Sequence, residues 1–198
     1  MLELCYQTQV PEAGCDEAGR GCLAGPLFAA AVILPHGFSH PLLNDSKQMS
    51  EKNRYLMRDI IIRESVAWAV EEVSPKEIDS INILNASIQG MWRSAMKLVP
   101  QPGFLLIDGN RFLKDPRIDF RCVVGGDGKY ANIAAASVLA KTFRDDRMKV
   151  LGAEFPCYGW DRNKGYPTKE HRLAIMEHGI SPHHRLTFNN GSGQLSLF

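Results

Sequence analysis

The sequence has no long apolar run and no paired-cysteine pattern. Its most apolar stretch, residues 23–34, contains Pro26 and is too short to span a bilayer. The first five residues carry an acid and no apolar run, which argues against a secretory signal. The five cysteines are odd in number and lack C-x-x-C spacing, which argues against a disulfide framework and a zinc site. We therefore expect a soluble cytoplasmic protein with small, buried cysteines.

The chain also has no excess of charge of one sign. Its 23 Lys and Arg residues and 22 Asp and Glu residues leave a formal net charge of +1. This balance excludes a strongly basic DNA-coating protein, although it is compatible with a local basic groove. The 198 residues are enough for one domain with a good core, and the 44% hydrophobic content is ordinary for a globular protein.

What the sequence does contain is an alternation of strand and helix patterns. Strands are expected at residues 27–34, 66–73, 104–109 and 120–124, which are short apolar runs. Helices are expected after the N-cap Ser50, from the capping box at residues 74–77 in pieces to Val99, over residues 131–150, and over residues 168–178. This alternation predicts an α/β domain with a mixed sheet covered by helices.

Residues 16–21, Asp-Glu-Ala-Gly-Arg-Gly, are the most informative segment of the chain. Carboxylates at Asp16 and Glu17 attract divalent metal ions. Gly19 and Gly21 let the backbone approach a ligand closely, and Arg20 pairs with phosphate in a fixed fork geometry. These properties within six residues suggest chemistry on a nucleic-acid backbone.

Two further acids follow the same pattern. Asp108 ends an apolar strand, and Asp127 lies in a Gly-Gly-Asp-Gly turn before a long helix. Acids at strand ends can converge at one edge of an α/β sheet, where they need a counterion such as Mg²⁺ or Mn²⁺. The alternative is that each acid only forms a turn. Because neighbours in a strand point to opposite faces, we expect Asp16 and Glu17 to share a site only if the strand bends or ends there.

Basic and aromatic residues accumulate after residue 131. Lys141 and Arg144 belong to the expected helix over residues 131–150, where nearby acids also allow plain surface ion pairing. Tyr166 stands before a proline among cations, so it either stacks on a sugar or base or is buried in a turn. Residues 183–185, His-His-Arg, are either a phosphate-facing turn or a surface cluster.

Taken together, these segments resemble the type 2 ribonuclease H family, that of bacterial ribonuclease HII. The matching segments occur in family order: DEAGRG (16–21), LAGP (23–26), AAAVIL (29–34), DSK (45–47), LLIDG (105–109), GD (126–127), IAAASVLAKTFRD (133–145), NKGYPT (163–168) and HHRLTF (183–188). The sequence departs from the family pattern at Cys22 (usually proline), Met49 (leucine), Gly126 (lysine) and Thr187 (serine).

The resemblance implies a ribonuclease H-like mixed sheet flanked by helices, with a small C-terminal helical segment. It implies endonucleolytic cleavage of RNA within RNA–DNA hybrids and at single ribonucleotides embedded in duplex DNA, giving 5′-phosphate and 3′-hydroxyl ends. Two Mg²⁺ or Mn²⁺ ions would be held by four carboxylates, which fall here on Asp16, Glu17, Asp108 and Asp127.

The same resemblance implies how the substrate is held. The backbone of Gly19, Arg20 and Gly21 would read the 2′-hydroxyl, the group that distinguishes RNA from DNA. Tyr166 would pack on the sugar beside the scissile step and favour an RNA-to-DNA junction. Further phosphate contacts are expected from Lys47, Ser137, Lys141, Arg144 and Arg185.

The C-terminus differs in composition from the rest of the chain. A catalytic domain is expected over residues 1–188, followed by a flexible tail over residues 189–198 that begins Asn-Asn-Gly-Ser-Gly. The last five residues resemble the peptide by which bacterial repair proteins dock on the sliding clamp, with contacts from Gln194, Leu195, Leu197 and Phe198. A disordered or self-packed terminus is the alternative.

Two other functions remain open on the sequence. A DNA nuclease or junction resolvase also uses clustered acids on such a sheet, and a non-catalytic clamp-associated module would not need the acids. Gly19, Arg20, Gly21 and Tyr166 favour the ribonuclease. The chain shows no obvious extra apolar element, so a monomer is expected.

Overall fold

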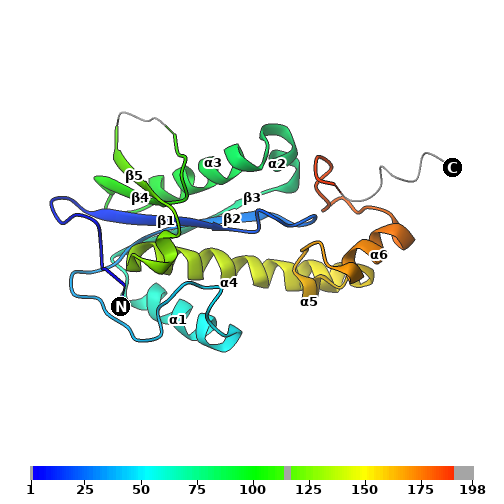
Figure 1. Cartoon of the computed structure of the whole chain (residues 1–198), viewed down its shortest axis with the longest axis horizontal. Coiled ribbons are helices and arrows are strands. Elements are labelled where there is room, and N and C mark those ends of the chain that lie inside the picture. Colours follow the sequence, from blue (N-terminus) through cyan, green and yellow to red (C-terminus); the bar gives the residue numbers. More distant parts are fainter. Residues whose placement is uncertain (1, 114–116, 190–198) are drawn as a thin grey trace.

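The computed structural model describes residues 2–113 and 117–189, which include a five-stranded mixed sheet (Figure 1). The strand order is β3-β2-β1-β4-β5. The strands are β1 (Glu12–Ala18), β2 (Leu27–Ile33), β3 (Ala67–Val73), β4 (Phe104–Asp108) and β5 (Asp119–Val123). The first three form an antiparallel meander, whereas β4 and β5 run parallel to β1. The predicted mixed sheet is confirmed.

Helices cover both faces of this sheet (Figure 1). One face carries α2 (Pro75–Ile81) and α3 (Ile83–Met96), and the other carries the long α4 (Ala131–Glu154) with α1 (Glu51–Glu64) against it. The short α5 (Trp160–Asn163) and α6 (Lys169–His178) gather at the far end of α4 and form the C-terminal helical segment. Two 3₁₀ turns, η1 (Gly126–Gly128) and η2 (Pro156–Tyr158), complete the elements.

Side-chain caps fix where several helices begin. The hydroxyls of Ser50, Ser74 and Thr168 each accept a hydrogen bond from the backbone N–H three residues later. Such a cap contributes about 1 kcal/mol to a helix. The N-caps Ser50 and Ser74 were predicted from the sequence, as was the helix in pieces, which is interrupted at Asn82 with φ of 65°.

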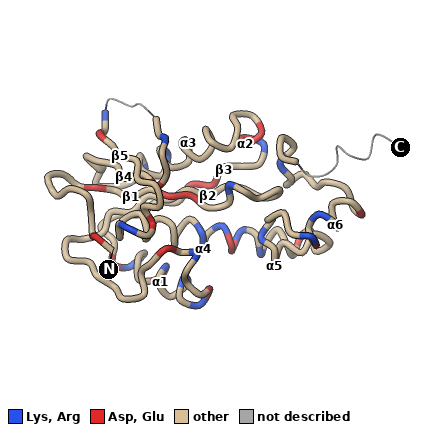
Figure 2. Tube along the Cα trace, in the orientation of Figure 1, with Lys and Arg blue, Asp and Glu red and all other residues tan. Residues whose placement is uncertain are grey.

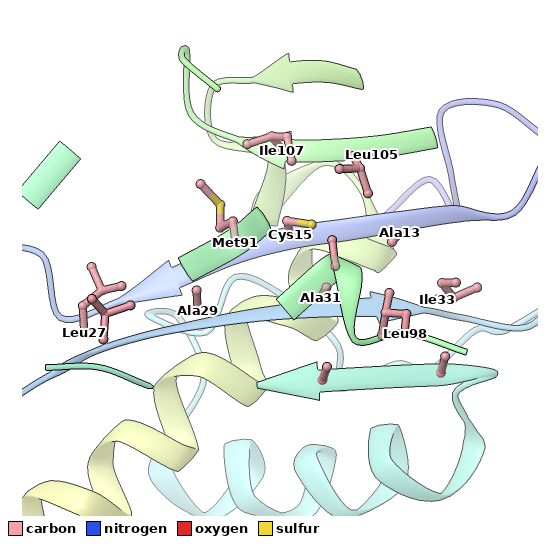
Figure 3. Packing of buried hydrophobic residues seen from close by; sticks show 14 of the residues in the cluster. Ala13, Cys15, Leu27, Ala29, Ala31, Ile33, Met91, Leu98, Leu105 and Ile107 are labelled. Carbon is pink, nitrogen blue, oxygen red and sulfur yellow. The ribbon is translucent and has the colours of Figure 1, made fainter. Parts of the chain in front are cut away.

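Two layers of apolar side chains hold the sheet to its helices. One layer lies between the sheet and α3 and includes Leu27, Met91 and Ile107 (Figure 3). The other lies between the sheet and α4 and is rich in alanine, with Met57 and Ile61 from α1. Burial of each leucine or isoleucine side chain contributes about 1.5–3 kcal/mol.

The close contact between α4 and β1 depends on Gly14. A Cβ atom at this position would lie 2.2 Å from the carbonyl carbon of Asn132, and no side chain tolerates that distance. The small residues Ala134, Ala135 and Ala136 continue the contact along the helix, and all are fully buried. Ser137, the next residue of α4, is thereby brought close to the strand that carries Asp16.

The elements differ from the expectation in three places. The segment before Asp16 was read only as an apolar lead-in, but β1 begins at Glu12 and continues through Ala18. Helix α4 extends four residues beyond Val150, and α5 was not predicted because four residues give no periodic pattern. In the described residues, no helix is both long and apolar enough to cross a membrane.

Candidate active site

Four acids lie around one edge of the sheet. Asp16 and Glu17 lie near the C-terminal end of β1, Asp108 ends β4, and Asp127 lies in η1. Strands β1 and β4 are parallel, and Cys15 stands opposite Ile107 in their register. The residues that follow this pair, Asp16 and Asp108, therefore lie at the same end of neighbouring strands.

Asp16 and Glu17 point to opposite faces of the sheet. The Asp16 carboxylate accepts a hydrogen bond from Ser137 of α4. The Glu17 carboxylate accepts one from Ser87 of α3 and lies 3.3 Å from Nη1 of Arg20. The strand does not end at Asp16, because β1 pairs with β2 through Ala18. The two acids still reach a common region, since both feel the charge of Asp108.

A cleft of about 360 Å³ lies against these acids, and we call it the acidic cleft. Its lining combines the end of β1 and the turn after it with the loop before α1, the end of β4 and one face of α4. The lining residues are Asp16, Glu17, Ala18, Gly19, Arg20, Gly21, Ser46, Lys47, Asp108, Ser137, Lys141 and Tyr166. The structure thus brings together ten residues that the sequence singled out for the site, from five separate segments.

Asp127 adjoins this cleft through Lys47. The Lys47 Nζ lies 3.6 Å from Oδ2 of Asp127, a buried oxygen that has no hydrogen-bond partner in the described residues. Asp108 is held towards the same turn, because its Oδ1 accepts the N–H of Gly126 at 2.7 Å. The lysine usual in the family at position 126 is absent here, and Lys47 supplies the cation beside Asp127 instead.

Burial and mutual repulsion at the acidic cleft make it unfavourable for Asp16, Glu17 and Asp127 to be ionised at the same time. Burial raises the pKa of Asp16 well above its usual value, and the charges of Glu17 and Asp108 raise it further. Burial likewise raises the pKa of Glu17 and of Asp127. Partial burial lowers the pKa of Lys47, but the surrounding carboxylates outweigh this effect and its pKa is raised overall.

The donor set suits a hard divalent cation, although it does not form a ready-made cage. Within residues 2–113 and 117–189, no three His, Cys, Asp or Glu side chains converge closely enough to hold one ion. The candidates are all carboxylate oxygens, the ligands that Mg²⁺ and Mn²⁺ prefer. The unpartnered Oδ2 of Asp127 and the raised carboxyl pKa values fit a site that a cation completes.

The turn after β1 is held from behind by two arginines. Gly19 has φ of 99°, and a Cβ atom there would lie 2.1 Å from Nε of Arg144. The Arg185 Nη1 donates to the carbonyl of Arg20 at 3.0 Å. Gly21 has open space around its Cα, so this side of the turn can be approached closely by a ligand.

Tyr166 also lines the acidic cleft. Its side chain is 39% exposed, so one part of the ring is available to a ligand. The Lys141 Nζ and the Arg144 Cζ each lie 5.8 Å from the ring centroid. Cations at this distance are attracted to the electrons of the ring, and this attraction restricts where the ring can lie.

Comparison with known proteins decides the family. The family model described as ribonuclease HII matches residues 13–191. The chain belongs to the ribonuclease HII family. A ribonuclease HII from Bacteroides fragilis is 64% identical over 199 residues, which cover 100% of this chain and 99% of the relative. Ribonuclease HII enzymes are metal-dependent endonucleases that hydrolyse RNA in RNA–DNA hybrids, so the chain is a ribonuclease H.

Solved structures agree on the ribonuclease H-like fold. The ribonuclease HII of the PCNA complex from Archaeoglobus fulgidus superposes with a TM-score of 0.73 at 24% identity, covering 90% of this chain and 95% of that one. The Bst ribonuclease HIII in complex with Mn²⁺ superposes with a TM-score of 0.70 at 16% identity, covering 93% of this chain and 69% of that one. The expected fold class is confirmed.

Two of the residues expected to contact phosphate, Arg144 and Arg185, are buried and bind backbone carbonyls. Both Arg144 and Arg185 have an exposed fraction of 0%. Arg144 donates to the carbonyls of Pro26, Lys164 and Ala24, and Arg185 donates to those of Gly25 and Arg20. Their guanidinium groups hold backbone segments together. The sequence pattern could not show whether these arginines bind phosphate or hold backbone carbonyls, because both roles use the same guanidinium donors.

Three other expected contacts of the ribonuclease HII do line the acidic cleft. Lys47 is largely exposed, and Lys141 pairs with Asp145 at 2.7 Å while facing Tyr166. Ser137 is buried and hydrogen-bonds both Asp16 and Ser46. The tail residues Gln194, Leu195, Leu197 and Phe198 lie outside the described residues.

Sequence reasoning missed two serines of this site. Ser46 lies within the Asp-Ser-Lys motif, and its Oγ is 2.9 Å from that of Ser137, so the motif itself could have pointed to it. Ser87 hydrogen-bonds Glu17 from the middle of α3, where no motif marks it. Only the packing of α3 on the sheet brings this hydroxyl to the acid.

Proposed function

We propose that this ribonuclease HII cleaves at single ribonucleotides embedded in duplex DNA, as well as in longer hybrids, and leaves 5′-phosphate and 3′-hydroxyl ends. The observation that carries the proposal is that the acidic cleft combines carboxylates, the Gly19–Gly21 turn and Tyr166. The turn contributes backbone to the cleft, and the tyrosine contributes a ring. One ribonucleotide followed by deoxyribonucleotides fits such a pair of contacts.

Asp16, Glu17, Asp108 and Asp127 would hold two divalent ions, Mg²⁺ or Mn²⁺. Support comes from the oxygen-only donor set, from the unpartnered Oδ2 of Asp127, and from the Mn²⁺ complex of the related ribonuclease HIII. When bound, such ions neutralise the charge that develops on a phosphodiester and help to generate the attacking hydroxide.

The other residues of the cleft act on the substrate's position. The Gly19–Gly21 backbone approaches the 2′-hydroxyl, because Gly21 leaves space for close contact and the arginines behind the turn keep it in place. Tyr166 packs on the neighbouring sugar. Lys47 and Lys141 contribute positive charge for phosphates, and the ammonium of Lys47 also limits repulsion among the acids.

The decisive experiment compares three duplexes: one with a single embedded ribonucleotide, one RNA–DNA hybrid, and one all-DNA control. We expect cleavage of the first two in Mg²⁺ or Mn²⁺ and none of the third. Tyr166→Ala tests the role of the cleft, and Trp68→Ala, at an exposed residue of β3, is its matched control. Cleavage of the all-DNA control would favour the resolvase alternative, and hybrid cleavage without single-ribonucleotide cleavage would contradict the proposal.

We further propose that residues 1–188 form the catalytic domain and that the tail over residues 189–198 docks on the bacterial sliding clamp. Two leucines and a terminal phenylalanine suit an apolar groove, and the Asn-Asn-Gly-Ser-Gly segment gives reach. The archaeal relative in complex with PCNA supports the idea. Deletion of residues 194–198 should abolish clamp binding in a titration while hybrid cleavage by the free enzyme stays unchanged. Unchanged clamp affinity would refute the docking role.

A further inference from the structure

A buried chain of hydrogen bonds joins the C-terminal segment to Tyr166. It consists of Trp160, His171, Ser181 and His184, and we call it the histidine network. The Trp160 Nε1 lies 2.9 Å from Nε2 of His171, whose Nδ1 lies 2.9 Å from the carbonyl oxygen of Tyr166. The Nε2 atoms of the two histidines are 3.2 Å apart. Trp160 and His171 have an exposed fraction of 0%.

The partners of each nitrogen fix both tautomers. The Nδ1 of His184 is 2.9 Å from both the N–H and the hydroxyl of Ser181, so it accepts, and its proton is on Nε2. That Nε2–H donates to the Nε2 of His171, which also accepts from Trp160. The proton of His171 is therefore on Nδ1, from which it donates to Tyr166. Both rings are neutral, and burial lowers the pKa of each.

The same segment also holds residues 23–25, which follow the Gly19–Gly21 turn in the chain. His184 pairs with Ala24 in an isolated bridge, and the N–H of Gly25 donates to the carbonyl of His183 at 2.9 Å. The N–H of Leu23 donates in turn to the carbonyl of Gly165 at 2.8 Å. Residues 23–25 thus lie between the residue before Tyr166 and the histidine network.

We propose that the histidine network is a positioning device that sets the distance between the Gly19–Gly21 turn and Tyr166, and so determines the preference for an RNA-to-DNA junction. It touches no substrate, because its members are buried behind the cleft wall. The inference rests on the proposed function, since it concerns the contact that reads the sugar after the ribonucleotide. Long hybrids offer the same contact at many steps and depend less on one fixed spacing.

Two small substitutions remove single donors from the network. Trp160→Phe keeps a ring but loses the indole N–H, and His184→Asn keeps an acceptor for Ser181 but loses the Nε2–H. His178→Asn is the matched control, because His178 is exposed on the same helix as His171 and lies outside the network. All three are compared with the wild type and with Tyr166→Ala.

The measured quantity is the ratio of kcat/KM for the single-ribonucleotide duplex to that for a long hybrid. We expect Trp160→Phe and His184→Asn to lower this ratio about five- to tenfold, towards the Tyr166→Ala value, and the control to leave it unchanged. A purely structural role would reduce both substrates in parallel, and that result would overturn the inference. The ratio is measured on active protein at one temperature, so a variant that folds less well still gives a valid ratio.

Tautomers measured by ¹⁵N NMR on the substrate-free wild type give a second, independent readout. We expect His171 protonated on Nδ1 and His184 protonated on Nε2, and the opposite pattern would overturn the inference. A wild type that does not cleave the single-ribonucleotide duplex would overturn the proposed function and this inference with it. A wild type that prefers that duplex, with network variants that keep the preference, would overturn the inference alone.

Discussion

The acidic cleft and the histidine network both bury polar side chains, but they satisfy them to different degrees. In the histidine network each ring nitrogen has a partner within 3.2 Å and no net charge is buried. In the acidic cleft three carboxyl groups have raised pKa values, and one buried oxygen of Asp127 has no hydrogen-bond partner in the described residues. The first arrangement is complete in the protein alone, and the second requires a cation.

This difference separates positioning from chemistry. Helix α4 runs from the acidic cleft, which Ser137 and Lys141 line, to Arg144, which holds the carbonyls of Ala24 and Pro26. Figure 2 shows the Lys and Arg positions of α4 in blue along the helix. Polar groups that are fully paired give a rigid frame. Carboxylates that are poorly satisfied bind a metal more readily, since the ion removes repulsion that already exists.

The largest expected effect, and the strongest test of this comparison, is that of Asp16→Asn. The substitution removes a proposed metal ligand and one of the repelling charges, so turnover in Mg²⁺ should fall about 10³-fold or more. Hybrid affinity should change little, and the metal-free protein should unfold at no lower temperature than the wild type. The readouts are single-turnover cleavage, a binding titration and thermal unfolding.

The matched control for that variant is Asp119→Asn. Asp119 is exposed at the start of β5, at the opposite end of the sheet from the cleft. It should retain full turnover. If Asp16→Asn also retained it, the acids would have no catalytic role and the contrast between the two regions would lose its meaning.

The sequence predicted the sheet and the residues that line the cleft more accurately than it predicted what those residues do. The strand pattern that ends at Asp108 predicted β4 correctly, because a strand pattern is a local signal, whereas the parallel pairing of β4 with β1 joins distant segments of the chain. The burial of Arg144 and Arg185 could not be predicted, since it depends on carbonyls more than a hundred residues away in the chain. The hydroxyl of Ser87 reaches Glu17 for the same reason, through the packing of α3.

The next largest effect concerns the frame itself. Arg144→Lys replaces a planar fork by a single ammonium and leaves buried carbonyls of Pro26, Ala24 or Lys164 without donors. We expect a loss of about 3 kcal/mol in the free energy of unfolding, or about 6–12 °C in Tm. Denaturant titration of the active enzyme measures it.

Arg162→Lys is the control for this loss, because Arg162 forms only exposed ion pairs. It should change stability by less than about 1 kcal/mol. A stable Arg144→Lys protein that binds the hybrid more weakly would show instead that Arg144 contacts a phosphate, because lysine keeps the charge but cannot reproduce the bidentate fork. That result would restore the expectation drawn from the sequence.

A divalent ion should stabilise the cleft and leave the network unaffected. At a concentration of about 100 Kd, Mg²⁺ or Mn²⁺ adds about 2.7 kcal/mol to the folded state, which corresponds to a Tm increase of about 5–10 °C. Asp127→Asn should reduce this increase, because Oδ2 of Asp127 is the unpartnered oxygen. Thermal unfolding with metal and with chelator checks it, and an equal increase in the variant would place the ion elsewhere.

The smallest expected effect is the response of the network to acid. Burial, and next in importance the neighbouring ring of His171, lowers the pKa of His184 to about 4. A histidine whose folded pKa is lowered stabilises the protein fully above its unfolded pKa of about 6.5, and this stability is lost as the pH falls towards 4. The loss should be on the order of 2 kcal/mol, after allowance for solvent screening.

The carboxylates of the cleft oppose this trend, because their raised pKa values favour the folded state as the pH falls. His184→Asn separates the two contributions. The neighbouring groups of the network, His183, Arg172 and Glu170, remain in that variant. Its unfolding free energy should lie below that of the wild type at pH 7 and approach it at pH 4.5, whereas His178→Asn should follow the wild type throughout. A constant difference between His184→Asn and wild type across this range would mean that His184 titrates normally, and the network would then not hold its histidines neutral.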